Sequence, residues 1–173
     1  MKDLGEASYV LGIEMHRDRS KGVLGLSQTA YIKKVLERYN MSTCSPTVAP
    51  VVKGDKFGDY QCPKTKIQSD QMKFIPYASA IGSLMYAQVC TRPDLAYIAG
   101  MLGRFQSNPG MDHYKAVKKV LRYLQRTKHY ILMYKKSDSL EVIGYADADH
   151  AGCVDGRRST SGYVFTLAGG AIS

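Results

Sequence analysis

Two carboxylates near the C-terminal end of the chain have the type and spacing that metal chemistry requires. Asp147 and Asp149 are separated by a single residue, Ala148, in a strand-like run. Side chains along a strand alternate between its two faces, so both carboxylates lie on the same face. Hard oxygen ligands on a rigid element are what Mg²⁺ binds in proteins. The same spacing is common on exposed edge strands, where charge discourages pairing with another chain. The sequence therefore allows two interpretations of this pair, a divalent-cation site and a solvated edge strand.

A second candidate site is the outer face of a predicted amphipathic helix over residues 112–127. Apolar residues recur along it at helical spacing, and we name the cations on its other side the basic stripe. The stripe consists of Lys115, Lys118, Arg122 and Arg126, with Lys119 beside it and Lys128 just beyond it. Asp112 is the only acid between Met111 and Lys136. A lysine-rich face is often only solvated, but the lack of compensating acids favours phosphate binding.

Composition limits the classes of protein and partner. The chain has 173 residues, of which 45% are hydrophobic and 23% charged, as in a soluble globular protein. The net charge of +9 points to an anionic partner, nucleic acid first. The four cysteines contain no C-x-x-C pair, so we expect free thiols and no zinc site. No apolar run approaches the ~18 residues of a membrane span, and the N-terminus lacks signal-peptide character. We therefore expect no membrane partner and a cytoplasmic or nuclear protein.

The elements that position these residues are those of an α+β fold. An N-terminal β-hairpin and a helix are expected first, then a long loop broken by prolines, a three-helix middle and a C-terminal partial antiparallel sheet. The expected strands are 7–16, 23–27, 130–135, 141–148 and 163–167, and the expected helices are 29–40, 77–89, 93–106 and 112–127, the last capped by Asp112. Turns are expected at Asp155-Gly156 and at Gly169-Gly170.

Several stretches resemble, in unbroken order, consecutive blocks of the Pol polyprotein of copia-type LTR retrotransposons, a retrovirus-related Pol polyprotein. They are MKDLGEASYVLGIEMHRDR, LSQTAYIKKVLERYNM, PYASAIGSLMYAQVCTRPDLAY, HYKAVKKVLRYLQRT and GYADADHAGCVDGRRSTSGYVF. The resemblance implies a segment from the end of the reverse transcriptase palm, through the thumb, into the start of ribonuclease H. It divides the chain into the end of the palm (1–41), a loop or linker (42–76), thumb- or connection-like helices (77–128) and a truncated ribonuclease H-like start (129–173).

The same resemblance implies roles for the carboxylates. Asp147 resembles the first metal-binding aspartate of ribonuclease H, whereas Asp149 is a neighbour that is not an expected ligand. The remaining metal-binding acids and the polymerase aspartates of the family fall outside residues 1–173, so both active sites are expected to be incomplete. His150 stands where the family commonly has tryptophan, and the chain contains no tryptophan. Mg²⁺ serves the parent family, and no cofactor is expected for this chain alone.

Three functions remain open from the sequence. The first is a catalytically incomplete reverse transcriptase/ribonuclease H fragment that binds an RNA–DNA hybrid or duplex without sequence choice, with the remainder of the Pol polyprotein as a further partner. The second is a divalent-metal-dependent nuclease, which the scarcity of acids near Asp147 disfavours. The third is an effector-like or domesticated interaction protein. An Arg-x-Leu-Arg motif would favour it, but residues 122–125 read Arg-Tyr-Leu-Gln.

Overall fold

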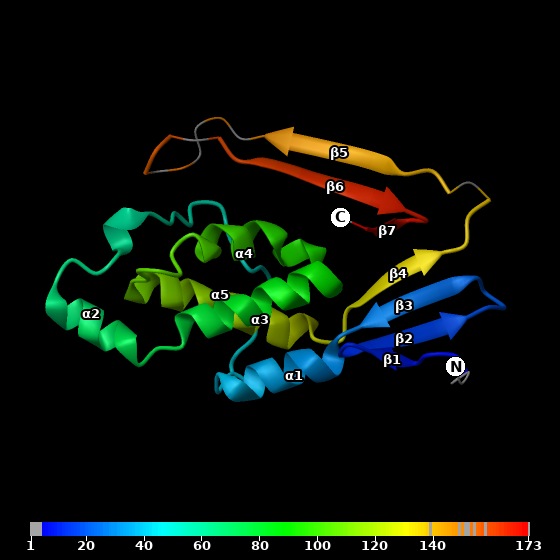
Figure 1. Ribbon diagram of the computed structural model, residues 1–173, viewed down its shortest axis with the longest axis horizontal. Helices are drawn as coiled ribbons and strands as arrows, with labels where there is room; N and C mark the ends of the chain where they lie inside the picture. The colour runs from blue at the N-terminus through cyan, green and yellow to red at the C-terminus, as the bar shows by residue number, and fades with distance from the viewer. Residues whose placement is uncertain are drawn as a thin grey trace.

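The chain folds into a helical body with two antiparallel sheets (Figure 1). The computed structural model describes residues 5–138, 140–148, 150, 153, 155–157 and 159–172. About 39% of the chain is helical and 20% is strand. The expected α+β class is confirmed.

The first sheet has the strand order β1-β2-β3-β4. It consists of β1 (Tyr9–Val10), β2 (Ile13–Asp18), β3 (Val23–Ser27) and β4 (Ile131–Lys135). The prediction of one strand over 7–16 was wrong, because Leu11 and Gly12 have φ values of 50° and 79°. Two consecutive left-handed residues make the tight turn that joins β1 to β2.

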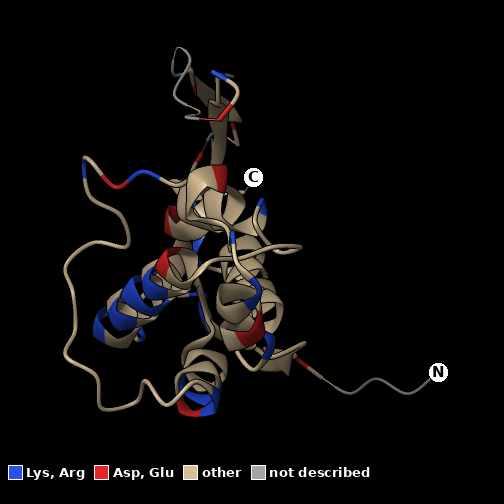
Figure 2. Cartoon of the chain, turned by 90° about the vertical axis from the view of Figure 1, so that its left-hand side faces the viewer, with Lys and Arg blue, Asp and Glu red and all other residues tan. Residues whose placement is uncertain are grey.

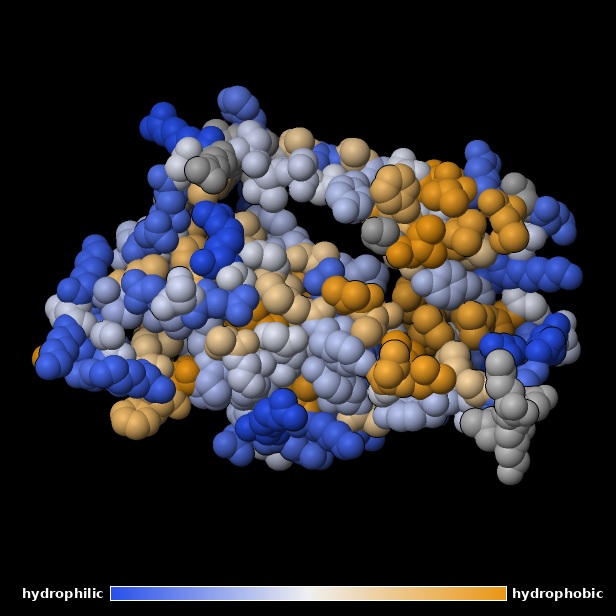
Figure 3. All heavy atoms as spheres, viewed as in Figure 1, coloured by the Kyte–Doolittle hydropathy of each residue, from blue (hydrophilic) through white to orange (hydrophobic). Residues whose placement is uncertain are grey.

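The second sheet consists of β5 (Ile143–Ala148), β6 (Ser161–Leu167) and β7 (Gly170–Ala171), in that order. The expected C-terminal antiparallel sheet is confirmed, but the inclusion of 130–135 in it was wrong, because β4 pairs with β3. Among the described residues, two hydrogen bonds link the sheets: the Lys135 N–H donates to the Ala168 carbonyl (3.0 Å), and the Tyr134 hydroxyl donates to the Ala171 carbonyl (2.6 Å). Figure 3 shows hydrophobic side chains gathered where the sheets meet.

Five α-helices form the described body: α1 (Thr29–Arg38), α2 (Lys66–Lys73), α3 (Tyr77–Cys90), α4 (Ala96–Gly103) and α5 (Met111–Thr127). Two 3₁₀ turns, η1 (Asp59–Gln61) and η2 (Pro93–Leu95), precede α2 and α4. The three-helix middle is confirmed, with Pro93 in the first turn as expected. The predicted helix over 93–106 begins as η2 and ends as an α-helix at Gly103.

The segment 42–76 is not a plain loop, because it contains α2. The Gln68 N–H donates to Thr65 Oγ1 (3.3 Å), and the Thr65 N–H donates to Gln68 Oε1 (3.3 Å), so the two residues form a capping box. The Thr-x-x-Gln spacing carried this signal, and the prolines around it led to the wrong prediction. Phe57 and Met72 bury their side chains in or near the core, so the segment also packs.

The main core lies where α1, α3, α4 and α5 meet. The expected apolar stripe of α5 is confirmed, since its four members are fully buried: Val117, Val120, Leu121 and Leu124. They contribute to one hydrophobic cluster with Ile81 and Leu84 of α3 and Leu102 of α4. All four cysteines are free, as expected. Within the described residues, no helix has the length and apolar character needed to cross a membrane.

Candidate nucleic-acid interface

Asp147 lies near the end of β5, paired with Gly162 of β6, and its side chain is exposed. Its Oδ1 accepts a hydrogen bond from the Ala148 N–H (2.9 Å). Asp149, its predicted companion on the same face, lies outside the described residues. The nearby acid Asp155 accepts a hydrogen bond at Oδ1 from the Asp59 N–H (2.8 Å) and so contacts the helical body.

A divalent cation needs several oxygen ligands, and the described part of the chain does not bring such a set together. Within the described residues, no three side chains of His, Cys, Asp or Glu lie together in a way that could hold a metal ion. One exposed carboxylate, with one oxygen already hydrogen-bonded to backbone, does not fit the two-metal arrangement that the family resemblance implies.

The basic stripe lies on α5 opposite the buried apolar stripe. Lysine and arginine recur along the length of this helix (Figure 2), and Lys115, Lys118, Arg122 and Arg126 are exposed. Lys119 and Lys128 are half-buried. The structure thus brings the four predicted stripe residues together on one surface and sets the two flanking lysines back from it.

Several of these cations already have partners. Lys115 pairs with Asp112 one turn earlier (2.9 Å), and Lys118 lies over the ring of Tyr114, 5.2 Å from its centroid. The Lys128 ammonium donates to Gln125 Oε1 (3.3 Å). An exposed ion pair within one helix is worth only about 0.3–0.5 kcal/mol, so a phosphate competes with it readily.

Lys119 has a partner that the local sequence does not reveal. Asp55, in the long segment after α1, approaches its ammonium to 2.6 Å, and both side chains are largely covered. Burial alone would raise the pKa of Asp55, but hydrogen bonds from Lys119 and the Val52 N–H hold that pKa below its usual value. The shortage of acids near the stripe is therefore partly made up from a distant segment.

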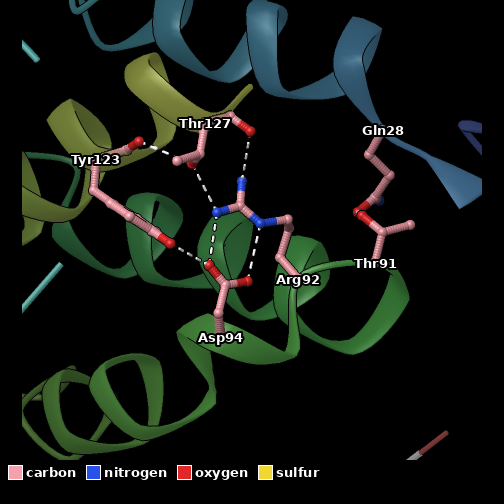
Figure 4. A network of polar contacts seen from close by, with 6 residues as sticks. All are labelled: Gln28, Thr91, Arg92, Asp94, Tyr123 and Thr127. Atoms are coloured by element: carbon pink, nitrogen blue, oxygen red, sulfur yellow. Dashed lines mark hydrogen bonds and ion pairs between the residues drawn. The ribbon is translucent and has the colours of Figure 1, made fainter. Parts of the chain in front are cut away.

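A buried arginine that sequence reasoning missed fixes the C-terminal end of α5 (Figure 4). Arg92 is only 2% exposed. Its Nε and Nη2 donate to the two carboxylate oxygens of Asp94 (2.9 and 2.7 Å). Its Nη1 donates to the Thr127 carbonyl (3.2 Å), and Nη2 to the Thr127 hydroxyl (2.8 Å). One guanidinium therefore joins the start of η2 to the last turn of α5.

Two tyrosines complete this arginine network. The Tyr123 hydroxyl donates to Asp94 Oδ2 (2.8 Å), and the Arg92 guanidinium lies 5.4 and 5.6 Å from the ring centroids of Tyr123 and Tyr130. Burial would raise the pKa of Asp94, but Arg92 and Tyr123 hydrogen-bond its carboxylate and keep that pKa below its usual value. Both rings therefore pack against the Arg92 guanidinium, which gives them a structural role in this network.

The N-terminal end of α5 depends on a histidine. The predicted cap, Asp112, was wrong: the N-cap is Gly110, whose N–H donates to His113 Nδ1 (3.0 Å). The His113 ring is fully buried and stacks on Phe105, with ring centroids 3.9 Å apart. Among the described residues, its Nε2 has no hydrogen-bond partner. Burial lowers the pKa of His113, so the neutral ring serves as the acceptor.

We expect His113 to make stability fall as the pH is lowered from about 7 to about 5. Its folded-state pKa is depressed, so the unfolded chain binds the proton more readily below the ordinary value of about 6.5. Chemical denaturation at both pH values measures the loss. His113→Gln should reduce it, whereas His16→Gln, at an exposed histidine, should not. Equal losses in all three proteins would contradict a role for His113. Asp55 and Asp94, whose pKa values are lowered in the fold, add a further loss of stability only below about pH 4.

Comparison with known proteins gives this surface a context. The chain is 48% identical over 173 residues to a retrovirus-related Pol polyprotein from transposon TNT 1-94 of Nicotiana tabacum, covering all of this chain and 13% of the relative. It is 36% identical over 167 residues to the Pol polyprotein from transposon RE1 of Arabidopsis thaliana, covering 96% of this chain and 11% of the relative. The chain therefore spans a small part of the polyproteins it matches.

A third relative is shorter. A protein of Plasmopara viticola named secreted RxLR effector protein 161 is 52% identical over 102 residues, covering 59% of this chain and 72% of the relative. No protein-family model matches the chain, and no solved structure matches it significantly. Together, the transposon relatives show that this chain belongs to the retrovirus-related Pol polyproteins of copia-type LTR retrotransposons.

Proposed function

We propose that this Pol segment joins the end of reverse transcriptase to the start of ribonuclease H, and that it holds nucleic acid through the basic stripe of α5. The observation that carries the proposal is the pair of exposed cations Lys118 and Arg126, on the face opposite a fully buried stripe. The partner is an RNA–DNA hybrid or duplex, bound without sequence choice, and the remainder of Pol is a further partner. A cytoplasmic or nuclear location follows from that partner and belongs to the proposal.

The stripe has dimensions that suit a phosphate backbone. Eight residues of helix separate Lys118 from Arg126, which at about 1.5 Å per residue is about 12 Å. Along one strand this length covers three to four phosphates at about 3.4 Å of axis each. Lysine and arginine contacts to phosphate release counterions and read no bases. Three or four such contacts support weak binding, with a Kd of about 10⁻⁴ to 10⁻⁶ M at physiological salt.

A salt titration of fluorescence anisotropy on a labelled hybrid duplex tests this binding. For Lys118→Gln/Arg126→Gln we expect the log–log slope of affinity against salt to flatten by about 1.8, since each lost phosphate contact removes about 0.9. Arg122 is left intact because its Nε donates to the Ser45 carbonyl, so its replacement would also disturb the preceding loop.

Lys33→Gln/Lys34→Gln is the matched control, because it removes two exposed charges from α1 and leaves α5 unchanged. Its slope should stay near that of the wild type. Equal flattening in both variants would show that binding follows net charge alone, and an unchanged slope in the α5 variant would leave the stripe as a solvated helix face.

We further propose that the chain by itself neither extends a primer nor cuts the RNA strand of a hybrid. Support comes from Asp147, whose exposed carboxylate has one oxygen hydrogen-bonded to backbone, and from the scattered placement of the described acids. The chain alone then needs no cofactor, and Mg²⁺ remains a property of the parent family.

Primer extension and hybrid cleavage assays with Mg²⁺ or Mn²⁺ should therefore give no product above background. Hybrid cleavage that disappears in Asp147→Asn would contradict this proposal and favour the divalent-metal nuclease. Persistent cleavage in that variant would indicate a contaminating nuclease instead.

The effector-like alternative gains little from the geometry. The Arg-Tyr-Leu-Gln run at 122–125 lies within α5, and its Leu124 is fully buried in the core. A short recognition motif needs accessible side chains, so this run does not favour that function.

A further inference from the structure

We infer that the segment Ser42–Lys56, which we name the strap, competes with nucleic acid for the cations of α5, so that phosphate binding and release of the strap are coupled. This inference rests on the proposed function. The strap follows α1 and passes beside α5 (Figure 2). It occupies donors on the same helix that the phosphates would use.

The strap contacts three successive turns of α5. Lys119 pairs with Asp55 at 2.6 Å. One turn later, Arg122 Nε donates to the Ser45 carbonyl (2.6 Å), and the Arg122 carbonyl accepts from the Thr47 N–H (3.4 Å). Further along, the side-chain amide of Gln125 donates to the Ser42 carbonyl. The strap therefore engages one stripe residue and the lysine beside it.

Asp55 is held ready for its cation by a local turn. The Asp55 N–H donates to the Val52 carbonyl (3.0 Å), and the Val52 N–H donates back to Asp55 Oδ2 (3.0 Å). Gly54 supplies the left-handed residue of this turn, with φ of 100°. The carboxylate that pairs with Lys119 is thus oriented before the pair forms, which makes it an effective competitor for that ammonium.

The strap is anchored in the core at its two ends, and its middle is less buried. Met41 and Phe57, on either side of it, are each 8% exposed and belong to the core cluster, whereas Val48 is 75% exposed. A groove of about 530 Å³ separates part of the strap from α5, and its lining includes Lys56, Lys115 and Lys119. Between these anchors, Cys44 and Val51 pack against the cluster but are only partly buried. The middle of the strap can therefore leave the helix while Met41 and Phe57 stay in the core.

Phosphate oxygens are stronger acceptors than some of the groups the strap offers. The Ser45 carbonyl that accepts from Arg122 is neutral, whereas a hydrogen bond from a guanidinium to a phosphate is assisted by charge at both ends. Asp55 is the one charged acceptor that the strap presents to α5 among the contacts described above. Neutralising Asp55 should therefore shift the competition toward nucleic acid.

The test measures the salt dependence of hybrid-duplex binding by the full chain. For Asp55→Asn we expect affinity to rise about two- to five-fold, the equivalent of losing a partly exposed ion pair. The log–log slope should steepen by about 0.9, since Lys119 becomes one additional phosphate contact. Lys119→Gln should leave the slope at the wild-type value, and Asp55→Asn/Lys119→Gln should return to it.

Asp70→Asn is the matched control, because it breaks the Lys73–Asp70 pair of α2 with the same change in charge. Equal gains in both aspartate variants, or no change of slope in Asp55→Asn, would overturn the competition. Loss of slope in Lys119→Gln alone would overturn it too, because Lys119 would then already contact phosphate in the wild type.

The same experiment distinguishes failure of the proposed function from failure of the competition by the strap. Binding by Asp55→Asn without binding by the wild type would support the strap as a full block and contradict binding by the unmodified chain. Absence of binding in both proteins would overturn the inference together with the proposed function. Circular dichroism melts of each variant verify that the fold is retained.

Discussion

Arg92→Ala should destabilise the chain by about 3 kcal/mol, more than the substitution of an exposed residue would. The guanidinium is 2% exposed and bonds both oxygens of Asp94 and two atoms of Thr127, so its removal leaves several buried groups unpaired. Breaking a buried pair by removing one partner costs about 3–5 kcal/mol. The lower end applies because the Asp94 side chain is 38% exposed and regains some hydration. Urea denaturation measures the loss.

Two variants sharpen this measurement. Arg38→Ala removes an exposed arginine from the last turn of α1 and should change stability by less than about 0.5 kcal/mol. Arg92→Lys keeps the charge but loses the planar fork that binds Asp94 with two nitrogens, so we expect an intermediate loss. A loss below about 1 kcal/mol in Arg92→Ala would mean that the network contributes little to the fold.

Gly110→Ala should cost about 2–3 kcal/mol, for steric and not conformational reasons. Gly110 has φ of −98° and ψ of 171°, which alanine adopts freely. An added Cβ would, however, lie 1.8 Å from the Gln61 carbonyl oxygen. The backbone at the end of η1 would have to move away from the start of α5, and such overpacking typically costs about 1–3 kcal/mol.

Gly100→Ala is the matched control within the same helical body. A Cβ at Gly100, inside α4, would meet none of the described atoms within 4 Å. Replacing a helical glycine with alanine should stabilise the chain by about 0.5–1 kcal/mol. Thermal melts of the two variants should therefore shift in opposite directions, and a Gly110→Ala protein as stable as the wild type would refute the close approach.

Periodic signals in the sequence were sufficient to predict α1, α3, α4 and α5, but not α2. The apolar stripe of α5 and the helices of the middle followed from spacing at 3.6 residues, because one face of each must be buried. The break at Leu11-Gly12 was missed because leucine gives no warning of a left-handed backbone, with its φ of 50°. The pairing of β4 with β3 was also missed, because strand partners distant in sequence are set by tertiary packing.

The candidate site was predicted in composition but not in its contacts. The exposure of Lys118 and Arg126 follows from their helical phase, which the sequence provides. The pairing of Lys119 with Asp55 does not, because the two residues lie 64 positions apart. Arg92 carried a weak signal at best, since an isolated arginine before a proline reads as a surface residue until Thr127 and Asp94 are placed around it.

The β3–β4 pairing has a consequence for how the chain folds. Val23 pairs with Lys135 and Ser27 with Ile131, and the Thr29 hydroxyl donates to the Lys128 carbonyl across 99 residues. The entropic cost of closing the loop between β3 and β4 is much lower once the intervening helices have collapsed. The three N-terminal strands should therefore gain β4 late in folding. During synthesis, β3 then leaves its edge bare until β4 has emerged from the ribosome, an interval of about 5–20 s for the roughly 100 residues between them.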